Sequence, residues 1–281
     1  MPRPVTAGLD GFPESRTAAH WAAHEAVLRD APLRLVHAWL LGSVTARQIP
    51  REDEQNLWAM RLLADTEAEL RGRHPGLEIT TELVPYEPEG ALLAESEKAL
   101  LLVLGSRGLG SVGGFLLGST GLRLAAHADC PVALVRGAPG ATPGAAGDVV
   151  VGVGTRHPVD SVPAFAFDEA ARRGANLRVV RAVRRLPHRH HSASGGDQDA
   201  AAHKELDAVL RPWRERYPGV AVDARLVADS PGRAVVDAAR GASLLVVGRH
   251  ATGAARPHGI GPVAHAAVHH APCPVAVVPY E

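Results

Sequence analysis

The feature that most constrains this fold is an internal repeat, spaced at about half the length of the chain. The segment DCPVALVR at 129–136 returns as PCPVAVVP at 272–279, and each matched residue is displaced by 143 positions. Other landmarks keep the displacement at 143, or at 144 near the start of each half: Gly105 and Gly248, Pro75 and Pro218, Pro88 and Pro231, Gly8 and Gly152. So many matches in register indicate a duplicated domain.

The length of the chain also suits two domains. Its 281 residues exceed one compact domain of about 100–150 residues and are comfortable for two. Between the repeats, residues 137–147 are rich in glycine, proline and alanine, a composition typical of a linker. We therefore predict a first domain at 1–136, a linker at 137–147 and a second domain at 148–281.

Each half alternates between strand and helix patterns. In the first half, short apolar runs predict strands at 4–10, 33–39, 79–85, 101–106 and 131–136. Helical spacing of apolar residues predicts helices at 15–30, 52–73 and 88–99, and from near 119 to about 127. Parallel neighbours need crossover connections, so this order predicts two tandem Rossmann-like α/β domains. Each is expected to be a five-stranded parallel sheet with helices on both faces.

Charge and composition exclude several classes of protein. Thirty basic and thirty acidic residues balance to a net charge of zero, which gives no general affinity for nucleic acid or for an anionic membrane. Two cysteines are too few for a disulfide framework or a four-thiolate metal site. No apolar run approaches the roughly 20 residues of a membrane span, and the N-terminus does not resemble a signal peptide. We expect a cytoplasmic protein.

The glycine-rich stretch LLVLGSRGLGSVGGFLLGST, residues 101–120, is the main candidate for a ligand site. It combines an apolar strand, a run of glycines and the start of a helix near Ser119. Glycines allow backbone N–H groups to approach an anion, and a helix N-terminus adds a favourable dipole. Asp10 ends the first predicted strand and is expected to face the same crevice, where it accepts hydrogen bonds from a sugar or base or helps to hold a metal.

Two familiar phosphate motifs do not match this stretch. A P-loop requires a Gly-Lys-Ser/Thr ending, and neither lysine of the chain is nearby. GLGSVG at 108–113 has the glycine spacing of a dinucleotide fingerprint, but it follows the fourth strand of its unit rather than the first. We reject both interpretations.

The spacing fits another pattern, Gly105-x2-Gly108-x9-Gly118-Ser119, which resembles the G-x2-G-x9-G-S/T motif of ATP-binding universal stress proteins. VTAGLDGFPESRTAAHWAAHEA, LRLVHAW and CPVALVR are also similar to segments of that family. The resemblance covers nearly all of 1–136, and it extends more weakly along 148–281. It implies a tandem universal stress protein whose domains are adenine nucleotide alpha hydrolase-like.

The resemblance also implies a ligand and its contacts. The ligand is ATP, accompanied by Mg²⁺ for which Asp10 is a possible contact. The implied nucleotide-binding residues are Asp10, His37, Ala38, Gly105, Arg107, Gly108, Gly118, Ser119 and Thr120. Within this set the backbone of His37 and Ala38 contacts adenine, and the residues from Gly105 onward contact ribose and phosphate. By the same analogy the final strands of the two domains pair as an internal pseudo-dimer, and a homodimer is a further option.

The second half has lost several of these residues. Gly154 stands where Asp10 stands in the first half, and Ala251 replaces the second loop glycine. Pro262 replaces Ser119, and proline offers neither an N–H nor a hydroxyl to a phosphate. We expect the second domain to bind ATP poorly or not at all.

The predicted function is therefore an ATP-binding protein of the stress response or of energy-state signalling. One alternative is an interaction module with the same fold and no nucleotide. The other is a slow ATPase, which the sequence disfavours because it shows no positioned lysine and only one candidate acid, Asp10.

Other polar clusters are interpreted as structural. His188, His190 and His191 lie in a stretch at 187–199 that we expect to be a mobile surface loop, with His203 nearby. His265 and His269 are four residues apart on a predicted helix, a spacing that helices produce easily without a metal. Cys130 and Cys273 occupy equivalent repeat positions and are expected to be small buried thiols.

Overall fold

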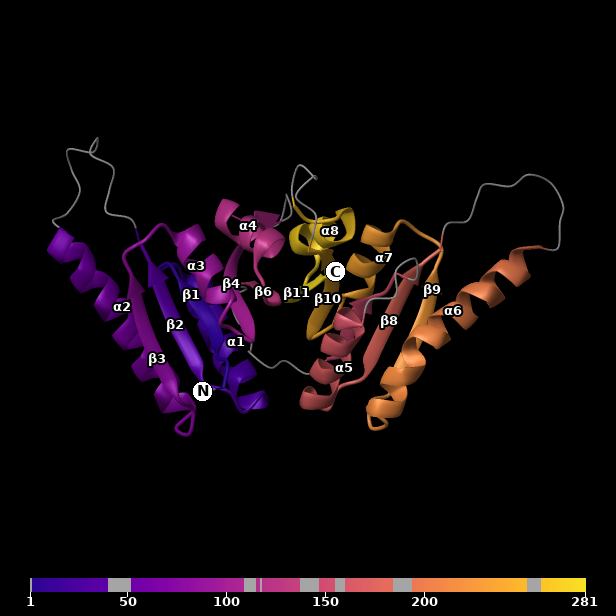
Figure 1. The fold of residues 1–281 in the computed structure, drawn as a ribbon, viewed down its shortest axis with the longest axis horizontal. Helices are drawn as coiled ribbons and strands as arrows, with labels where there is room; N and C mark the ends of the chain where they lie inside the picture. The colour runs from indigo at the N-terminus through magenta and orange to yellow at the C-terminus, as the bar shows by residue number, and fades with distance from the viewer. Residues whose placement is uncertain are drawn as a thin grey trace. The chain divides into compact units, whose positions relative to one another are not determined.

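The computed structural model of the chain consists of two compact units, one holding β1 to β6 and the other holding β7 to β11 (Figure 1). The structure describes residues 2–39, 52–108, 115–116, 118–136, 147–154, 160–183, 194–251 and 259–281. Helices in the described part of the chain do not reach the combination of length and apolar character that crossing a bilayer requires.

The first domain is a doubly wound α/β unit. Its elements, in chain order, are β1 (Val5–Leu9), α1 (Pro13–Leu28), β2 (Leu33–Ala38), α2 (Glu52–Arg73), β3 (Ile79–Val84), α3 (Pro88–Ser96), β4 (Leu101–Gly108), β5 (Phe115–Leu116), α4 (Ser119–His127) and β6 (Val132–Arg136). Five strands pair in parallel in the order β3-β2-β1-β4-β6. Helices α1 and α2 cover one face of this sheet, and α3 and α4 cover the other.

Burial explains why the central strands are apolar along their whole length. Leu101, Leu102 and Val103 of β4 have no exposed surface, because helices cover both faces of the sheet. Helix α1 meets the sheet through fully buried alanines, including Ala18 and Ala22, whose small side chains let the helix approach the strands closely.

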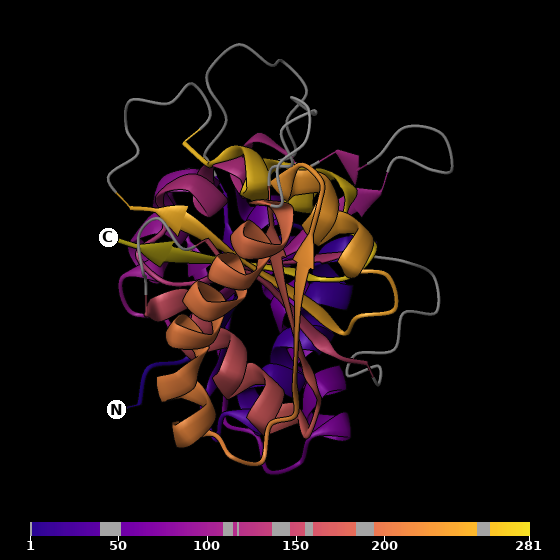
Figure 2. The same cartoon turned by 90° about the vertical axis from the view of Figure 1, so that its right-hand side faces the viewer.

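The second domain repeats this arrangement. Its elements are β7 (Val149–Gly152), α5 (Ser161–Arg173), β8 (Leu177–Ala182), α6 (Ser194–Arg216), β9 (Val222–Val227), α7 (Pro231–Ala238), β10 (Leu244–His250), α8 (Pro262–His270) and β11 (Val275–Tyr280). The strands pair in parallel in the order β9-β8-β7-β10-β11. Figure 2 shows α6 lying along β9, on the face that α5 also covers, and α7 and α8 cover the other face. The predicted fold class, two tandem Rossmann-like domains, is confirmed.

Two local features differ from the sequence prediction. Strand β4 continues through Gly108, two residues beyond the predicted strand at 101–106, and its end pairs with β5 in antiparallel fashion, Arg107 opposite Leu116. Helix α6 begins at Ser194, inside the segment predicted to be a mobile loop. Extending an existing helix costs less than nucleating one, so the strong helical pattern further along α6 carries the helix into polar sequence.

Both cysteines are buried and unpaired with each other. Cys130 precedes β6 and Cys273 precedes β11, at equivalent places in the two repeats. Burial raises the pKa of the Cys130 thiol to about 11, because the thiolate would lose its hydration. Cys130 is therefore a small apolar side chain at neutral pH rather than a reactive nucleophile.

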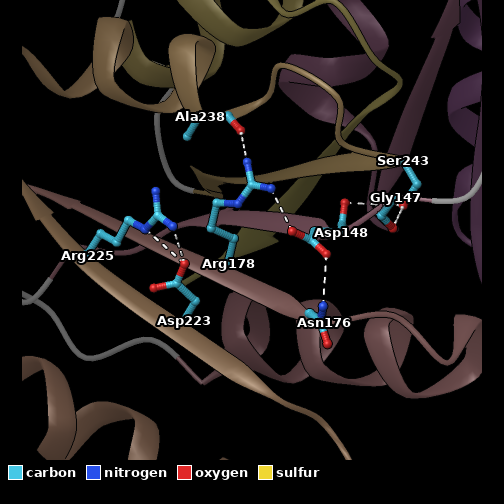
Figure 3. A network of polar contacts seen from close by, with 8 residues as sticks. All are labelled: Gly147, Asp148, Asn176, Arg178, Asp223, Arg225, Ala238 and Ser243. Atoms are coloured by element: carbon cyan, nitrogen blue, oxygen red, sulfur yellow. Dashed lines mark hydrogen bonds and ion pairs between the residues drawn. The ribbon is translucent and has the colours of Figure 1, made fainter.

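At the amino ends of its strands, the second domain carries a polar network centred on Arg178 (Figure 3). The Arg178 guanidinium donates to the carbonyl oxygen of Ala238 at 2.8 Å and to the Asp148 carboxylate at 2.6 Å. Asn176 donates to the other oxygen of that carboxylate at 3.2 Å. The network thereby ties the starts of β7 and β8 to the end of α7.

Arg34, the equivalent arginine of the first domain, makes its polar contacts with different partners. Arg34 donates to the Glu95 carboxylate at 2.8 Å and also pairs with Glu82 of β3. Glu95 corresponds to Ala238 in the repeat. The second domain therefore has no carboxylate at the position equivalent to Glu95. Arg178 donates to the backbone carbonyl of Ala238 there instead. Asp148, which precedes β7, supplies the missing negative charge.

Replacing Arg178 with methionine is expected to lower the free energy of unfolding of the second domain by about 1–3 kcal/mol. The change removes the Arg178 donor from the Asp148 carboxylate and from the Ala238 carbonyl, and both are partly shielded from water. Urea denaturation measures the loss. Arg225→Met is the control, because Arg225 is mostly exposed and its ion pair among the described residues is with Asp223 of its own strand, so no measurable change is expected. Equal losses of unfolding free energy in the two variants would contradict the stabilising role of the Arg178 network.

Candidate functional site

The order of strands in the first domain creates a switch point between β1 and β4. From β1 the chain moves outward to β2 and β3, and from β4 it moves in the opposite direction to β6. In open parallel sheets, ligands bind outside the carboxyl ends of the strands at such a point. Asp10 directly follows β1, and the glycine loop directly follows β4, so the fold brings both sequence-predicted segments to this edge. We call this region, with the end of β2, the switch-point edge.

Asp10 is exposed and lies in a tight turn that leads into α1. Its carboxylate oxygen Oδ1 accepts a hydrogen bond from the backbone N–H of Phe12 at 3.0 Å, and the Asp10 N–H donates to the Ser15 hydroxyl at 3.3 Å. Gly11 between them has a φ of +83°, a conformation that favours glycine. Among the described residues the other oxygen, Oδ2, has no hydrogen-bond partner. The turn therefore fixes the carboxylate and leaves one oxygen available to a ligand.

The end of β2 lies beside this turn, because β1 and β2 pair in parallel with Leu9 opposite His37. The buried His37 ring is held in place by a 2.7 Å hydrogen bond between its Nδ1 and the carbonyl oxygen of Leu9. Since a carbonyl only accepts, Nδ1 carries the proton in this contact. Ala38 follows at the last position of the strand. The two residues that the resemblance assigns to adenine thus lie next to Asp10 at the switch-point edge.

A tryptophan that the sequence analysis did not single out also lies here. Trp58 of α2 is 51% exposed, and its ring centroid is 5.5 Å from that of His37, with the two ring planes at 75°. The atoms Cη2 and Cζ2 of the indole lie 2.6 Å from where a Cβ atom on Gly11 would be. The only sequence signal was a large aromatic residue within the polar helix 52–73, and helical spacing alone does not show which edge of the sheet it meets.

Gly105 is required by the packing of β4 against α1. A Cβ atom at this position would lie 2.6–2.7 Å from the backbone atoms of Glu14 and Ser15. Real Cβ contacts are not that short, so the first turn of α1 and the carboxyl half of β4 approach as closely as they do only because Gly105 has no side chain. This contact places the Asp10 turn against the start of the glycine loop.

Helix α4 begins at the same edge, because it follows β4 and returns the chain to the amino end of the parallel strand β6. Gly118 is the N-cap residue, with no side-chain hydrogen bond to the free N–H groups of the first turn. Ser119 is exposed and Thr120 is half-buried, and a Cβ atom on Gly118 would meet nothing within 4 Å. The first turn of α4 therefore offers N–H groups and hydroxyls to an anion in open space.

The N-terminus of α3, the helix that packs beside α4, differs because a carboxylate already occupies it. The Glu87 side chain accepts hydrogen bonds from the backbone N–H groups of Glu89 and Gly90 at the start of α3. Glu89 in turn pairs with Arg123 of α4. The first turn of α4 thus differs from that of α3 in having no acidic residue and no side-chain cap.

Two sequence-predicted residues, Arg107 and Gly108, are described by their backbone alone, as the end of β4. Arg107 pairs with Leu116 and Gly108 with Phe115 of β5, so this pairing brings the two ends of the glycine loop together. The remaining loop positions, 109–114 and 117, lie outside the described residues.

The corresponding edge of the second domain is built differently. Gly154 offers no carboxylate, and Pro262 is the first residue of α8 after the N-cap Gly261. At Gly248, the counterpart of Gly105, the nearest atoms are side-chain atoms of Tyr280 at 2.8 Å and Val162 at 2.9 Å from an added Cβ, rather than backbone. Ala251 donates its N–H to the Tyr280 carbonyl at 2.6 Å. The second domain therefore repeats the fold without repeating the polar groups of the switch-point edge.

The histidine clusters add no metal centre among the described residues, where no group of three or more potential ligand side chains converges. The rings of His265 and His269 are 4.4 Å apart on α8, as their helical spacing requires. His203 is exposed on α6. The predicted cluster at His188, His190 and His191 lies outside the described residues.

Comparison with known proteins gives consistent results along the whole chain. The family model of the universal stress protein family matches residues 1–136 and again residues 147–279. A universal stress protein of Mycobacterium tuberculosis is 33% identical over 286 aligned positions, which cover 97% of this chain and 96% of the relative.

Solved structures agree in fold. The crystal structure of a universal stress protein from Archaeoglobus fulgidus covers 99% of both chains with a TM-score of 0.76 and 14% identity, which shows a common fold. A universal stress protein in complex with cAMP is 25% identical over 48% of this chain, with a TM-score of 0.38. The cAMP ligand belongs to that structure.

Proposed function

The chain belongs to the universal stress protein family, and on this premise we propose that its first domain binds an adenine nucleotide, ATP with Mg²⁺, at the switch-point edge. The observation that carries the proposal is the convergence of three features on one edge of one sheet. These features are the Asp10 turn after β1, the glycine loop after β4 and the uncapped first turn of α4.

Eight of the nine predicted residues, all except Arg107, have a physical role in this proposal. The Oδ2 atom of Asp10 accepts hydrogen bonds from ribose hydroxyls, and the backbone of His37 and Ala38 contacts the base. The N–H groups and hydroxyls of Ser119 and Thr120 donate to phosphate oxygens, which a helix N-terminus favours through its dipole. Glycines at 105, 108 and 118 let the backbone approach the ligand closely.

The residues present also fit a magnesium ion carried by the nucleotide. Mg²⁺ prefers oxygen ligands, is held mainly by the phosphates themselves and needs only one or two carboxylates from the protein. Asp10 supplies one exposed carboxylate at this edge. The ion would neutralise the charge of the phosphates.

In this proposal the bound nucleotide is a signal, and the chain acts in the stress response or in sensing of the energy state. The second domain is proposed to lack the site, because Gly154, Ala251 and Pro262 replace an acceptor, a glycine and a donor. Location in the cytoplasm stays a prediction.

Titration with Mg-ATP by calorimetry tests the proposal, using the wild type and an Asp10→Asn variant. The asparagine amide oxygen still accepts from the Phe12 N–H, so the turn survives while the charge and one acceptor are lost. We expect affinity to fall by about tenfold, since hydrogen bonds to a charged group contribute about 1.5–3 kcal/mol. ADP measured in the same samples reports any hydrolysis.

Asp129→Asn is the matched control, because Asp129 is an exposed carboxylate beside the amino end of β6, at the opposite edge of the sheet. Its affinity for Mg-ATP is expected to equal that of the wild type. A wild type that binds no adenine nucleotide contradicts the proposal, and so does an Asp10→Asn variant of unchanged affinity.

A further inference from the structure

We propose that Trp58 is the residue that recognises the nucleobase, and that its indole ring forms a stacking surface for the base at the switch-point edge. The inference rests on the proposed function, because it assigns a contact within that same site. It goes further by predicting that the first domain selects ligands by their aromatic base and that phosphate contacts alone do not account for the affinity.

The position of the indole is fixed by contacts on two sides. Its six-membered ring, at Cη2 and Cζ2, lies against Gly11, the residue next to the Asp10 carboxylate. Its plane stands at 75° to the buried His37 ring, with the centroids 5.5 Å apart, a favourable edge-to-face geometry. His37 is itself held by its hydrogen bond to the Leu9 carbonyl, so the tryptophan rests on a rigid support.

The exposure of this side chain is what points to a ligand. A tryptophan buries a large apolar area when it lies in a core, yet Trp58 leaves 51% of its surface exposed while its ring packs on His37 and lies against Gly11. The half-exposed indole lies against the residue next to Asp10, the only carboxylate that we place in the site. An aromatic face beside an acceptor for ribose hydroxyls has the two chemical features needed for a nucleoside.

Gly11 and Trp58 are adapted to each other. A methyl group on Gly11 would lie 2.6 Å from the indole, so any other residue would displace the ring. The positive φ at Gly11 also forms the turn in which Asp10 Oδ1 accepts from the Phe12 N–H. One glycine thus positions both the carboxylate and the aromatic ring.

The second domain shows that the fold itself does not require an aromatic residue here. Trp58 corresponds to Ala201, and His37 corresponds to Arg181. The Arg181 guanidinium donates to the Ala202 carbonyl at 2.7 Å and pairs with Glu205 at 2.6 Å, so α6 is anchored to β8 by polar contacts. The two equivalent positions of the second domain therefore carry no aromatic side chain.

The test compares ligands with and without a base. Calorimetry measures the affinity of Mg-ATP and of magnesium tripolyphosphate for the wild type, Trp58→Ala, Trp58→Phe and the control Met60→Ala. Met60 is an exposed apolar residue two positions along the same helix, a spacing at which two side chains do not share a helix face. Base stacking on an aromatic side chain supports an expected loss of about tenfold in ATP affinity for Trp58→Ala.

Three further results are expected if the base stacks on Trp58. The Trp58→Phe variant stays within about threefold of the wild type, because phenylalanine keeps a stacking face. Tripolyphosphate binds equally to all four proteins, and Met60→Ala binds ATP as the wild type does. Circular dichroism on heating establishes that each variant is folded.

The possible failures are distinguishable. If the wild type and Trp58→Ala bind ATP equally, the role of Trp58 is overturned and the proposed function stands. If Trp58→Ala weakens ATP and tripolyphosphate by the same factor, the residue only supports the fold of the site, and base recognition is again overturned. If the wild type binds no adenine nucleotide, the proposed function fails and the role of Trp58 fails with it.

Discussion

A Gly118→Val variant is expected to lose Mg-ATP affinity by about a hundredfold while its first domain remains folded. Gly118 has a φ of −59°, which any residue adopts, and open space around its Cβ position, so the fold accommodates valine. A nucleotide phosphate at the first turn of α4 would meet the valine methyl groups and lose N–H donors. Two such bonds to a charged group at about 1.5 kcal/mol each give a factor of this size.

Gly261→Val provides the matched control, since Gly261 is the N-cap of α8 and corresponds to Gly118 in the repeat. Nucleotide affinity is expected to stay at the wild-type value, because the proposed site lies in the first domain. Calorimetry gives the affinity and thermal unfolding gives the stability. Undiminished binding by a folded Gly118→Val variant would remove the first turn of α4 from the site.

A Gly105→Ala variant is expected to have the opposite signature, a large loss of stability. The added methyl group would lie 2.6–2.7 Å from backbone atoms of Glu14 and Ser15, and backbone cannot rotate out of the way as a side chain can. The start of α1 must move away from β4, and overpacking of this kind costs about 1–3 kcal/mol. Urea denaturation is expected to show the loss in the first domain.

Gly248→Ala in the second domain tests the reason for that loss. An added Cβ atom at this position would meet side-chain atoms of Tyr280 and Val162 at similar distances. Tyr280 is half-exposed, so its ring has room to turn aside. We expect a loss of about 1 kcal/mol or less, the lower end of the range for overpacking. If both alanine variants lose equal stability, backbone contact is not what makes Gly105 necessary.

Much of the fold was predictable because its signals are local or repeated. Apolar runs and helical spacing marked the strands and the helix Glu52–Arg73, and the displacement of 143 residues carried each assignment into the second half. Parallel order then followed from the alternation of strand and helix. The polar start of α6 was missed, because its helical state depends on the residues that follow it rather than on its own composition.

The sequence marked the segments of the proposed site but not the different structural reasons for its glycines. Gly105 and Gly118 belong to one motif, yet backbone of α1 crowds the first and nothing surrounds the second. Trp58 was missed for a similar reason. Its place against Gly11 depends on how α2 lies on the sheet, and periodicity along one helix does not determine that.

The Arg178 network illustrates a further limit of sequence patterns. Arg34 and Arg178 are equivalent arginines, but the carboxylate partners of Arg34 lie on α3 and β3, whereas that of Arg178 precedes β7. A compensating change at a distant position is visible only once the chain is folded. Such changes explain how the two halves keep one architecture while their edges differ.

The most direct test of the whole proposal is the amount of adenine nucleotide that the purified chain carries. The protein is purified without added nucleotide, incubated with Mg-ATP, freed of unbound ligand and denatured, and the released nucleotide is quantified by chromatography. We predict about one adenine nucleotide per chain, reduced in Gly118→Val and unchanged in Gly261→Val. Two per chain would contradict the loss of the site in the second domain, and none would contradict nucleotide binding altogether.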